Sequence, residues 1–267
     1  MSCDRAKVER VAHKEEIIPR HPSPLPNACL PVDRGRERGV REDATMKKFF
    51  SVLFGLVIIP SVIAGAAQKD LDLQGKKLVS QKPPFTLTLP SEFKLVHSFL
   101  HENPQESSLT RVYFLVKSRE KQAEEMLILQ IADRTNPQAG PIIAPPLKPY
   151  TEKRLYSKGK VKKGEIEVNY LTQLMAWNPD APSLQPIVKK GFVIPAHWAL
   201  QGQLLFHYQG ENAVLCRYSR ATDSFGVKVS DRGDAWERGM ISGNEKKVYE
   251  AFQKSFMEMI DSIQIRK

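Results

Sequence analysis

Short runs of alternating apolar and polar residues dominate the chain from residue 85 onward. Phe85–Leu89 alternates apolar with hydroxyl side chains, as expected of a half-buried strand. Phe93–Leu100 reads as a second strand, and Arg111–Lys117 and Met126–Ala132 read as two more that pair as a hairpin. The pattern predicts antiparallel strands that follow one another along the chain.

A second group of strands lies closer to the C-terminus. Glu165–Trp177 is a long alternating strand, and Gln203–Gln209 and Ala213–Thr222 form the clearest hairpin of the chain. Between the two groups, Thr135–Pro149 holds five prolines, which predicts a loop or an extended crossing. Tyr150–Ser157 is expected to form a short helix.

The C-terminal segment has a helical period. Its apolar residues recur at spacings of four, four, three and four: Val248, Phe252, Phe256, Met259 and Ile263. Such a stripe packs one face of a helix on a sheet. Ile263–Lys267 is expected to continue as a closing strand. The predicted fold class is therefore α+β, an antiparallel β-sheet packed by helices that include this C-terminal amphipathic helix.

Residues 46–67 have the three regions of a signal peptide. Lys47-Lys48 supplies the positive charge, Phe49–Ile59 is an apolar core of 11 residues, and small side chains follow up to Ala66 and Ala67. The expected cleavage site is near Ala66/Ala67, which makes the protein periplasmic or secreted. An uncleaved membrane anchor is the alternative, because the uncharged stretch approaches the roughly 20 residues that cross a bilayer.

The signal peptide divides the chain into three parts. Residues 1–45 are rich in proline and charge and are expected to be a disordered extension, with the true start at Met46. Residues 68–267 form a single mature α+β domain. Of 40 Lys and Arg and 30 Asp and Glu, residues 1–67 hold 11 and 8, which leaves the mature part a formal charge of about +7. Cys216 is its one cysteine and is expected to be a small core residue.

The mature part contains no familiar motif for a nucleophile, a phosphate loop or a metal, and no cofactor is predicted. His97 and His101 are four residues apart, but a strand would separate them, so they do not predict a metal site. The strongest concentration of charge is basic and could contact a ligand or an anion. Its members are Lys153, Arg154, Lys158, Lys160, Lys162 and Lys163. A solvated basic hairpin between two elements is the alternative.

Two segments resemble the PsbP-like domain family. Phe85–Phe93 resembles that family's opening strand and turn, with Phe93 where tryptophan is common, and Tyr249–Ile265 resembles its last helix and closing strand. The resemblance extends over roughly residues 80–267, from which the proline-rich 135–149 departs. It implies an α-β-α sandwich around an antiparallel sheet and an accessory or assembly role. It implies no active-site residues for this chain.

These observations favour an exported, non-catalytic binding or accessory domain of the bacterial cell envelope. It would act through a protein partner or an anionic envelope component, without nucleic acid and without a transmembrane anchor after cleavage. The alternative is an envelope-acting hydrolase, whose site would be assembled by folding from His197 or His207 and acidic groups.

Overall fold

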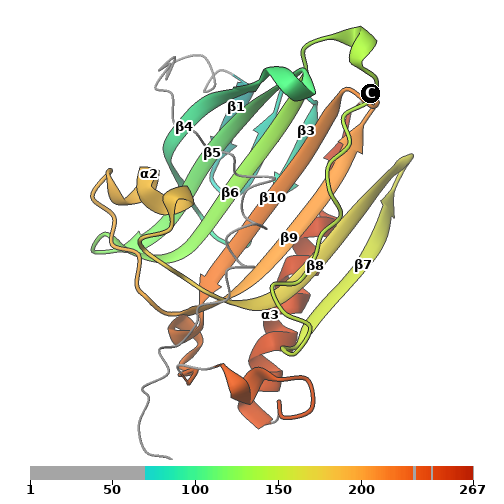
Figure 1. Ribbon diagram of the computed structural model, residues 1–267. Helices are drawn as coiled ribbons and strands as arrows, with labels where there is room; N and C mark the ends of the chain where they lie inside the picture. Colours follow the sequence, from blue (N-terminus) through green and yellow to red (C-terminus); the bar gives the residue numbers. More distant parts are fainter. Residues whose placement is uncertain (1–69, 231–232, 242, 267) are drawn as a thin grey trace, which may run out of the picture. The chain divides into compact units, whose positions relative to one another are not determined.

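The computed structural model describes residues 70–230, 233–241 and 243–266, and the described strands form two antiparallel sheets (Figure 1). The predicted extension 1–45 and the predicted signal peptide 46–67 lie outside the described residues. The described residues all belong to the same compact unit of the chain.

The larger sheet has seven strands among the described residues, in the order β4-β5-β6-β10-β9-β8-β7, and every neighbouring pair is antiparallel. The pairing of β10 with β6 joins the two predicted hairpins at the centre of the sheet. The strands are β4 (Lys94–Asn103), β5 (Ser108–Arg119), β6 (Gln122–Arg134), β7 (Tyr156–Lys163), β8 (Ile166–Ala176), β9 (Trp198–Tyr208) and β10 (Asn212–Ala221).

The smaller sheet has the order β1-β2-β3-β11 and is also antiparallel. Its strands are β1 (Leu71–Gln74), β2 (Lys77–Ser80), β3 (Phe85–Thr88) and β11 (Gln264–Ile265). The described α-helices are α2 (Gln185–Val188) and α3 (Gly243–Asp261). Short 3-10 turns are η2 (Pro104–Glu106), η3 (Pro137–Ala139), η4 (Pro182–Leu184), η5 (Thr222–Phe225) and η6 (Asp234–Trp236). None of the described helices is both long and apolar enough to span a membrane.

The predicted α+β class is confirmed, as are the C-terminal helix and the closing strand, which pairs with β3. One hairpin was not predicted and one local prediction is wrong. The hairpin that was not predicted is β1–β2, with Gly75 in its turn at a φ of 59°. Tyr150–Ser157 is not helical, because its last residues start β7 and pair with β8.

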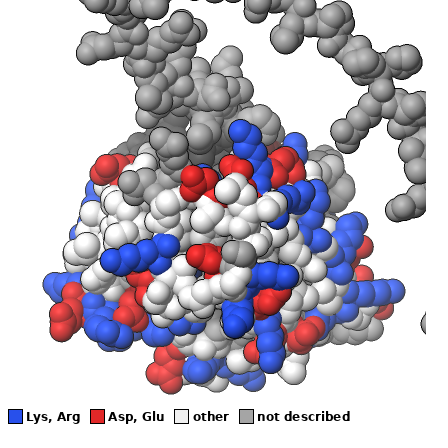
Figure 2. All heavy atoms as spheres, turned by 90° about the horizontal axis from the view of Figure 1, so that it is seen from below, with Lys and Arg blue, Asp and Glu red and all other residues white. Residues whose placement is uncertain are grey.

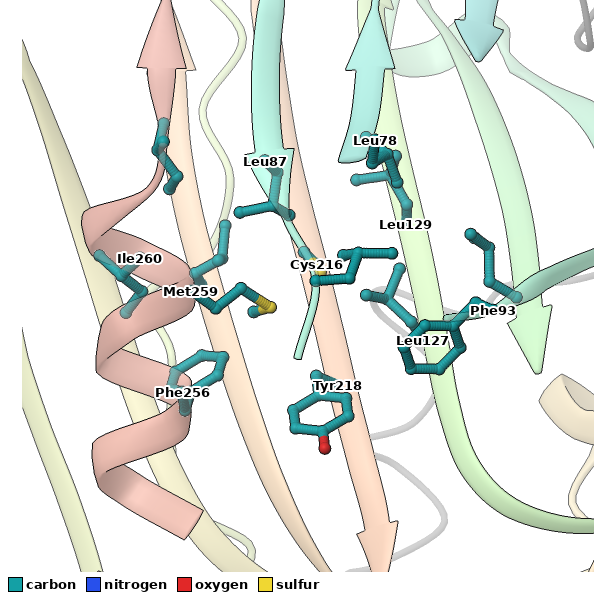
Figure 3. Packing of buried hydrophobic residues seen from close by; sticks show 14 of the residues in the cluster. Leu78, Leu87, Phe93, Leu127, Leu129, Cys216, Tyr218, Phe256, Met259 and Ile260 are labelled. Atoms are coloured by element: carbon teal, nitrogen blue, oxygen red, sulfur yellow. The ribbon is translucent and has the colours of Figure 1, made fainter. Parts of the chain in front are cut away.

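The core lies between the larger sheet and a layer that contains both α3 and the smaller sheet (Figure 3). Phe256 and Met259 of α3 are buried against the sheet together with Leu87 of β3 and Cys216 of β10. Burying a side chain of this size contributes about 1.5–3 kcal/mol. Burial also raises the pKa of the Cys216 thiol to about 12, so this cysteine is an unreactive core residue, as predicted.

The opposite, outer face of the larger sheet is covered in part by loops. The segment that contains α2 packs on Val112, Phe114 and Met126. Residues 140–150, which we call the strap, cross the outer face in extended form from the end of β9 to β8 (Figure 1). The prediction of an extended crossing in the proline-rich segment is therefore confirmed.

Candidate functional site

The six basic residues of the predicted contact lie on and beside β7, where they do not share one face. Lys158, Lys160 and Lys162 are exposed and pair in register with Leu171, Asn169 and Glu167 of β8. Directly opposed residues of an antiparallel pair point to the same side of a sheet. The three lysines therefore stand in one row on the outer face.

The other three basic residues have different surroundings. Lys163 points to the inner face, where its Nζ donates to Asp261 Oδ1 of α3 at 2.8 Å. Lys153 and Arg154 precede the strand, and the Arg154 guanidinium lies 4.4 Å from the centre of the Trp198 ring. Partial burial lowers the pKa of Arg154, and Glu237 opposes this shift. Lys153 is also exposed but lies before the strand, so Lys158, Lys160 and Lys162 are the exposed members of the predicted contact on β7 itself.

The backbone of the same strand has an open side. β7 is the last strand of the sheet order and pairs with β8 among the described strands. A two-residue turn, Gly164-Glu165, joins the two strands, so the pair Lys163–Ile166 next to it is hydrogen-bonded. Hydrogen-bonded and non-bonded pairs then alternate along the hairpin. By this alternation, the N–H and C=O groups of Lys158, Lys160 and Lys162 point away from β8.

Two hollows of the described surface lie at the two ends of β7. The first, about 420 Å³, opens at its start, between the strand, the segment before α3, and α3 itself. It is lined by Leu155, Tyr156, Ser157, Arg238, Ile241, Lys246, Tyr249, Glu250 and Gln253. The second, about 410 Å³, lies at the other end and is lined by Lys160, Lys162, Glu165 and Glu167. Lys160 and Lys162 of the row therefore line the second hollow, and Lys158 lies between the two hollows.

Tyr156 is the centre of the contacts at the first hollow. The Arg238 guanidinium lies 3.9 Å above its ring, and Lys158 Nζ lies 5.8 Å from the ring centre. Its hydroxyl donates to a carboxylate oxygen of Glu152. A cation held over a tyrosine face is attracted to the ring, and this attraction fixes the Arg238 side chain at the rim of the hollow.

Acidic side chains lie close to the basic side chains on and around β7. Lys160 Nζ lies 2.8 Å from Glu167 Oε1, but their side chains are 63% and 54% exposed, so the pair is weak and can exchange. Figure 2 shows the described part from below, with Lys and Arg side chains interleaved with Asp and Glu rather than gathered in one basic area. The positive charge of the lysine row is therefore offset in part by Glu167.

The structure does not bring His197 and His207 together. His197 directly precedes β9 and His207 is near the end of that strand, so about ten steps of roughly 3.4 Å separate them. His197 Nε2 lies 3.4 Å from Asp223 Oδ2, and both side chains are half exposed. An enzyme site built on these residues could use one histidine but not both.

His207 instead holds the strap. Its Nε2 accepts a hydrogen bond from the backbone N–H of Ala144 at 3.2 Å, and this contact requires an unprotonated Nε2. Burial lowers the pKa of His207 from its usual 6.5. Because the folded-state pKa is the lower one, the stabilisation from this contact is complete above about pH 6.5 and is lost as the pH falls through the folded-state value.

We therefore expect the Ala144 amide to lose protection from hydrogen exchange only when the pH falls below the usual histidine value of 6.5, because burial lowers the pKa of His207. NMR-detected exchange measures this protection. His207→Gln keeps an acceptor but cannot titrate, so it is expected to remove the pH dependence. The same loss of protection in this variant would contradict the assignment.

A buried carboxylate, Glu125, forms a separate polar cluster on the inner side of the sheet. Its oxygens accept from Ser91 Oγ at 2.9 and 3.0 Å, from Lys117 Nζ at 2.7 Å and from the Tyr218 hydroxyl at 2.8 Å. Burial and the adjacent carboxylate raise the pKa of Tyr218 far above its usual value. With a side chain only 1% exposed, Glu125 links these three side chains in the interior of the fold.

Among the described residues, no group of three or more His, Cys, Asp and Glu side chains is placed to hold a metal ion. His97 and His101 both lie on β4 and are separated along the strand; burial, and then the charge of Lys190, lower the pKa of His97.

The sequence predicted the lysines but not the rest of the site. Arg238 and Lys246 join the first hollow from a segment more than 70 residues farther along the chain, and no local pattern links them to β7. The alternation of lysines with Ser157, Gly159 and Val161 was the available signal for an edge strand.

Comparison of the chain with protein-family models, curated proteins and solved structures found no match.

Proposed function

We propose that this chain is an exported, non-catalytic binding or accessory domain of the bacterial cell envelope, and that it contacts an anionic partner along β7. The single observation that carries the proposal is the edge of β7, which is unpaired among the described strands and carries Lys158, Lys160 and Lys162 in one exposed row that extends from beside the first hollow into the second. A surface of this kind can bind an extended anionic molecule without enclosing it.

Export is part of the proposal and rests on the sequence. The pattern of residues 46–67 and the predicted cleavage near Ala66/Ala67 support a mature domain in the periplasm or outside the cell. The resemblance of residues 80–267 to PsbP-like domains also supports an accessory or assembly role. The finer prediction, a PsbP-like α-β-α sandwich, belongs to this proposal as well.

Charge reversal of the row tests the contact. The purified chain and the variant Lys158→Glu, Lys160→Glu, Lys162→Glu are compared for binding to polyglutamate, to phosphatidylglycerol vesicles and to polygalacturonate. We expect the variant to lose at least about tenfold in affinity for whichever probe the chain binds, because it replaces attraction by repulsion.

The matched control makes the same change of net charge elsewhere. Lys76→Glu, Lys77→Glu, Lys94→Glu alters three exposed lysines, one in the β1–β2 turn, one at the start of β2 and one at the start of β4, the opposite edge strand of the larger sheet. This control is expected to keep most of the affinity. The proposed contact is wrong if both variants lose affinity equally, or if the unaltered chain binds none of the three probes.

A further inference from the structure

We infer that the partner contacted at β7 is a protein, and that an extended acidic segment of it adds to the larger sheet as an eighth, antiparallel strand. This inference rests on the proposed function, because it names the partner class for the same site. It requires an accessible strand edge, matching charges and room for the side chains of the added strand.

The backbone of β7 supplies the edge. The strand is eight residues long, and the N–H and C=O groups of Lys158, Lys160 and Lys162 point away from β8. A peptide that pairs with these groups gains main-chain hydrogen bonds in the manner of strand addition at a sheet edge. Lipid head groups and polysaccharides have no regular row of paired donors and acceptors, so they would use the lysine charges but leave this edge unused.

The side chains of the row set the charge pattern of the added strand. In an antiparallel pair, the residues opposite these three lysines project to the same side of the sheet. Alternate positions of the partner therefore face Lys158, Lys160 and Lys162, and acidic residues at those positions would match them. Glu167, which now pairs with Lys160 at an exposed site, can be replaced by such a residue at small cost.

The same lysines also have a protective effect. A row of lysines on an edge strand prevents two copies of the edge from pairing, because like charges would face each other. An acidic strand removes this repulsion, whereas a second copy of β7 retains it. The row thus selects an acidic partner over self-association.

The first hollow gives room on the other side of the added strand. It opens beside Tyr156 and Ser157 at the start of β7, and Ile241 and Tyr249 supply apolar surface next to Arg238. A large side chain from the partner, on the side opposite its acidic residues, would fit this depression. A smooth lipid surface would leave it empty.

The test measures the affinity of the full, unaltered chain for three decapeptides of alternating Thr and Glu, each with blocked termini. In the predicted pairing, the backbone N–H groups of the Glu residues donate to β7, and those of the Thr residues point away. One peptide is unmodified, the second is N-methylated at every Glu and the third at every Thr. The two methylated peptides have equal charge and equal methyl content, so they are matched controls for one another.

We expect methylation at Glu to weaken binding by about tenfold or more and methylation at Thr to change it much less, since tenfold corresponds to the loss of a few main-chain hydrogen bonds. Equal binding of all three peptides would overturn strand addition and leave the anionic contact standing. Binding to phosphatidylglycerol vesicles but to no peptide would overturn the protein partner alone. Absence of binding to peptides, vesicles and polygalacturonate would overturn the proposed function as well.

Self-association is tested in the same series. The chain and the charge-reversal variant at Lys158, Lys160 and Lys162 are compared by sedimentation over a range of concentrations. We expect the unaltered chain to form no dimer through these lysines, so both proteins should sediment alike. A dimer that depends on these lysines would overturn the inference, because a second copy would then occupy the edge.

Discussion

Arg111→Met is expected to lower the free energy of unfolding by about 3–5 kcal/mol, the usual cost of removing one partner of a buried ion pair. Arg111 and Asp133 are 3% and 7% exposed, and two parallel hydrogen bonds of 2.9 Å join the guanidinium to the carboxylate. Without Arg111, the Asp133 carboxylate keeps the hydrogen bond from Asn212 Nδ2 at 2.6 Å but has no opposite charge beside it.

Arg111 also joins separate parts of the fold. Its Nη1 donates to Asp70 Oδ2 at 2.8 Å, just before β1, and its Nη2 donates to the backbone oxygen of Lys82. The same side chain thus connects the smaller sheet to the larger one. Its loss is expected to loosen the β1–β2 hairpin. Amide hydrogen exchange, followed by NMR at increasing urea concentration, would detect this as exchange of the hairpin amides before those of the rest of the fold.

A second variant distinguishes the cost of breaking the ion pair from the cost of lost packing at Arg111. Arg111→Met combined with Asp133→Leu removes both charges and is expected to recover much of the lost stability, because no buried charge is left without its partner. If the double variant is less stable than Arg111→Met, the buried carboxylate is not the source of the cost.

Phe256→Ala is expected to cost about 3–5 kcal/mol, since it empties the fully buried position at which α3 meets the larger sheet. The same ring lies over Gly202 of β9. A Cβ atom added at Gly202 would come 2.4 Å from Phe256 Cδ2, so Gly202→Ala is expected to cost about 1–3 kcal/mol through overpacking.

The two changes are expected to be non-additive. Phe256→Ala clears the space that a methyl group at Gly202 needs, so the double variant should lose less stability in urea unfolding than the sum of the single ones. Gly239→Ala is the control, because an added Cβ there meets nothing within 4 Å and is expected to change stability by less than about 0.5 kcal/mol. Strict additivity would contradict the close contact between Gly202 and Phe256.

Alternation and period predicted the elements that bury one face. Phe85–Leu89 and Arg111–Lys117 each lie within or overlap an observed strand, because a half-buried strand needs an apolar residue at every second position. Met126–Ala132 lies within β6 and is nearly continuously apolar, as expected of a central strand. The stripe from Val248 to Ile263 predicted α3 for the corresponding helical reason.

The parts that were not predicted depend on contacts between distant residues. β7 carries Ser157, Gly159 and Val161 on its inner side, which gives little apolar signal, and Gly159 has no room for a side chain because a Cβ would meet the Tyr170 ring. The pairing of Arg111 with Asp133 depends on the register of β5 and β6. Local patterns carry no information on register or on the hollows between elements.

Mass spectrometry of the chain purified from its native envelope fraction tests the central claim most directly, with the Lys158, Lys160, Lys162 charge-reversal variant measured beside it. The account predicts a denatured mass that begins at Ala67 or Gln68, and under native conditions an additional bound mass that the variant lacks. A denatured mass that retains residues 46–67, or a bound mass that is the same in both proteins, would contradict an exported domain that binds through β7.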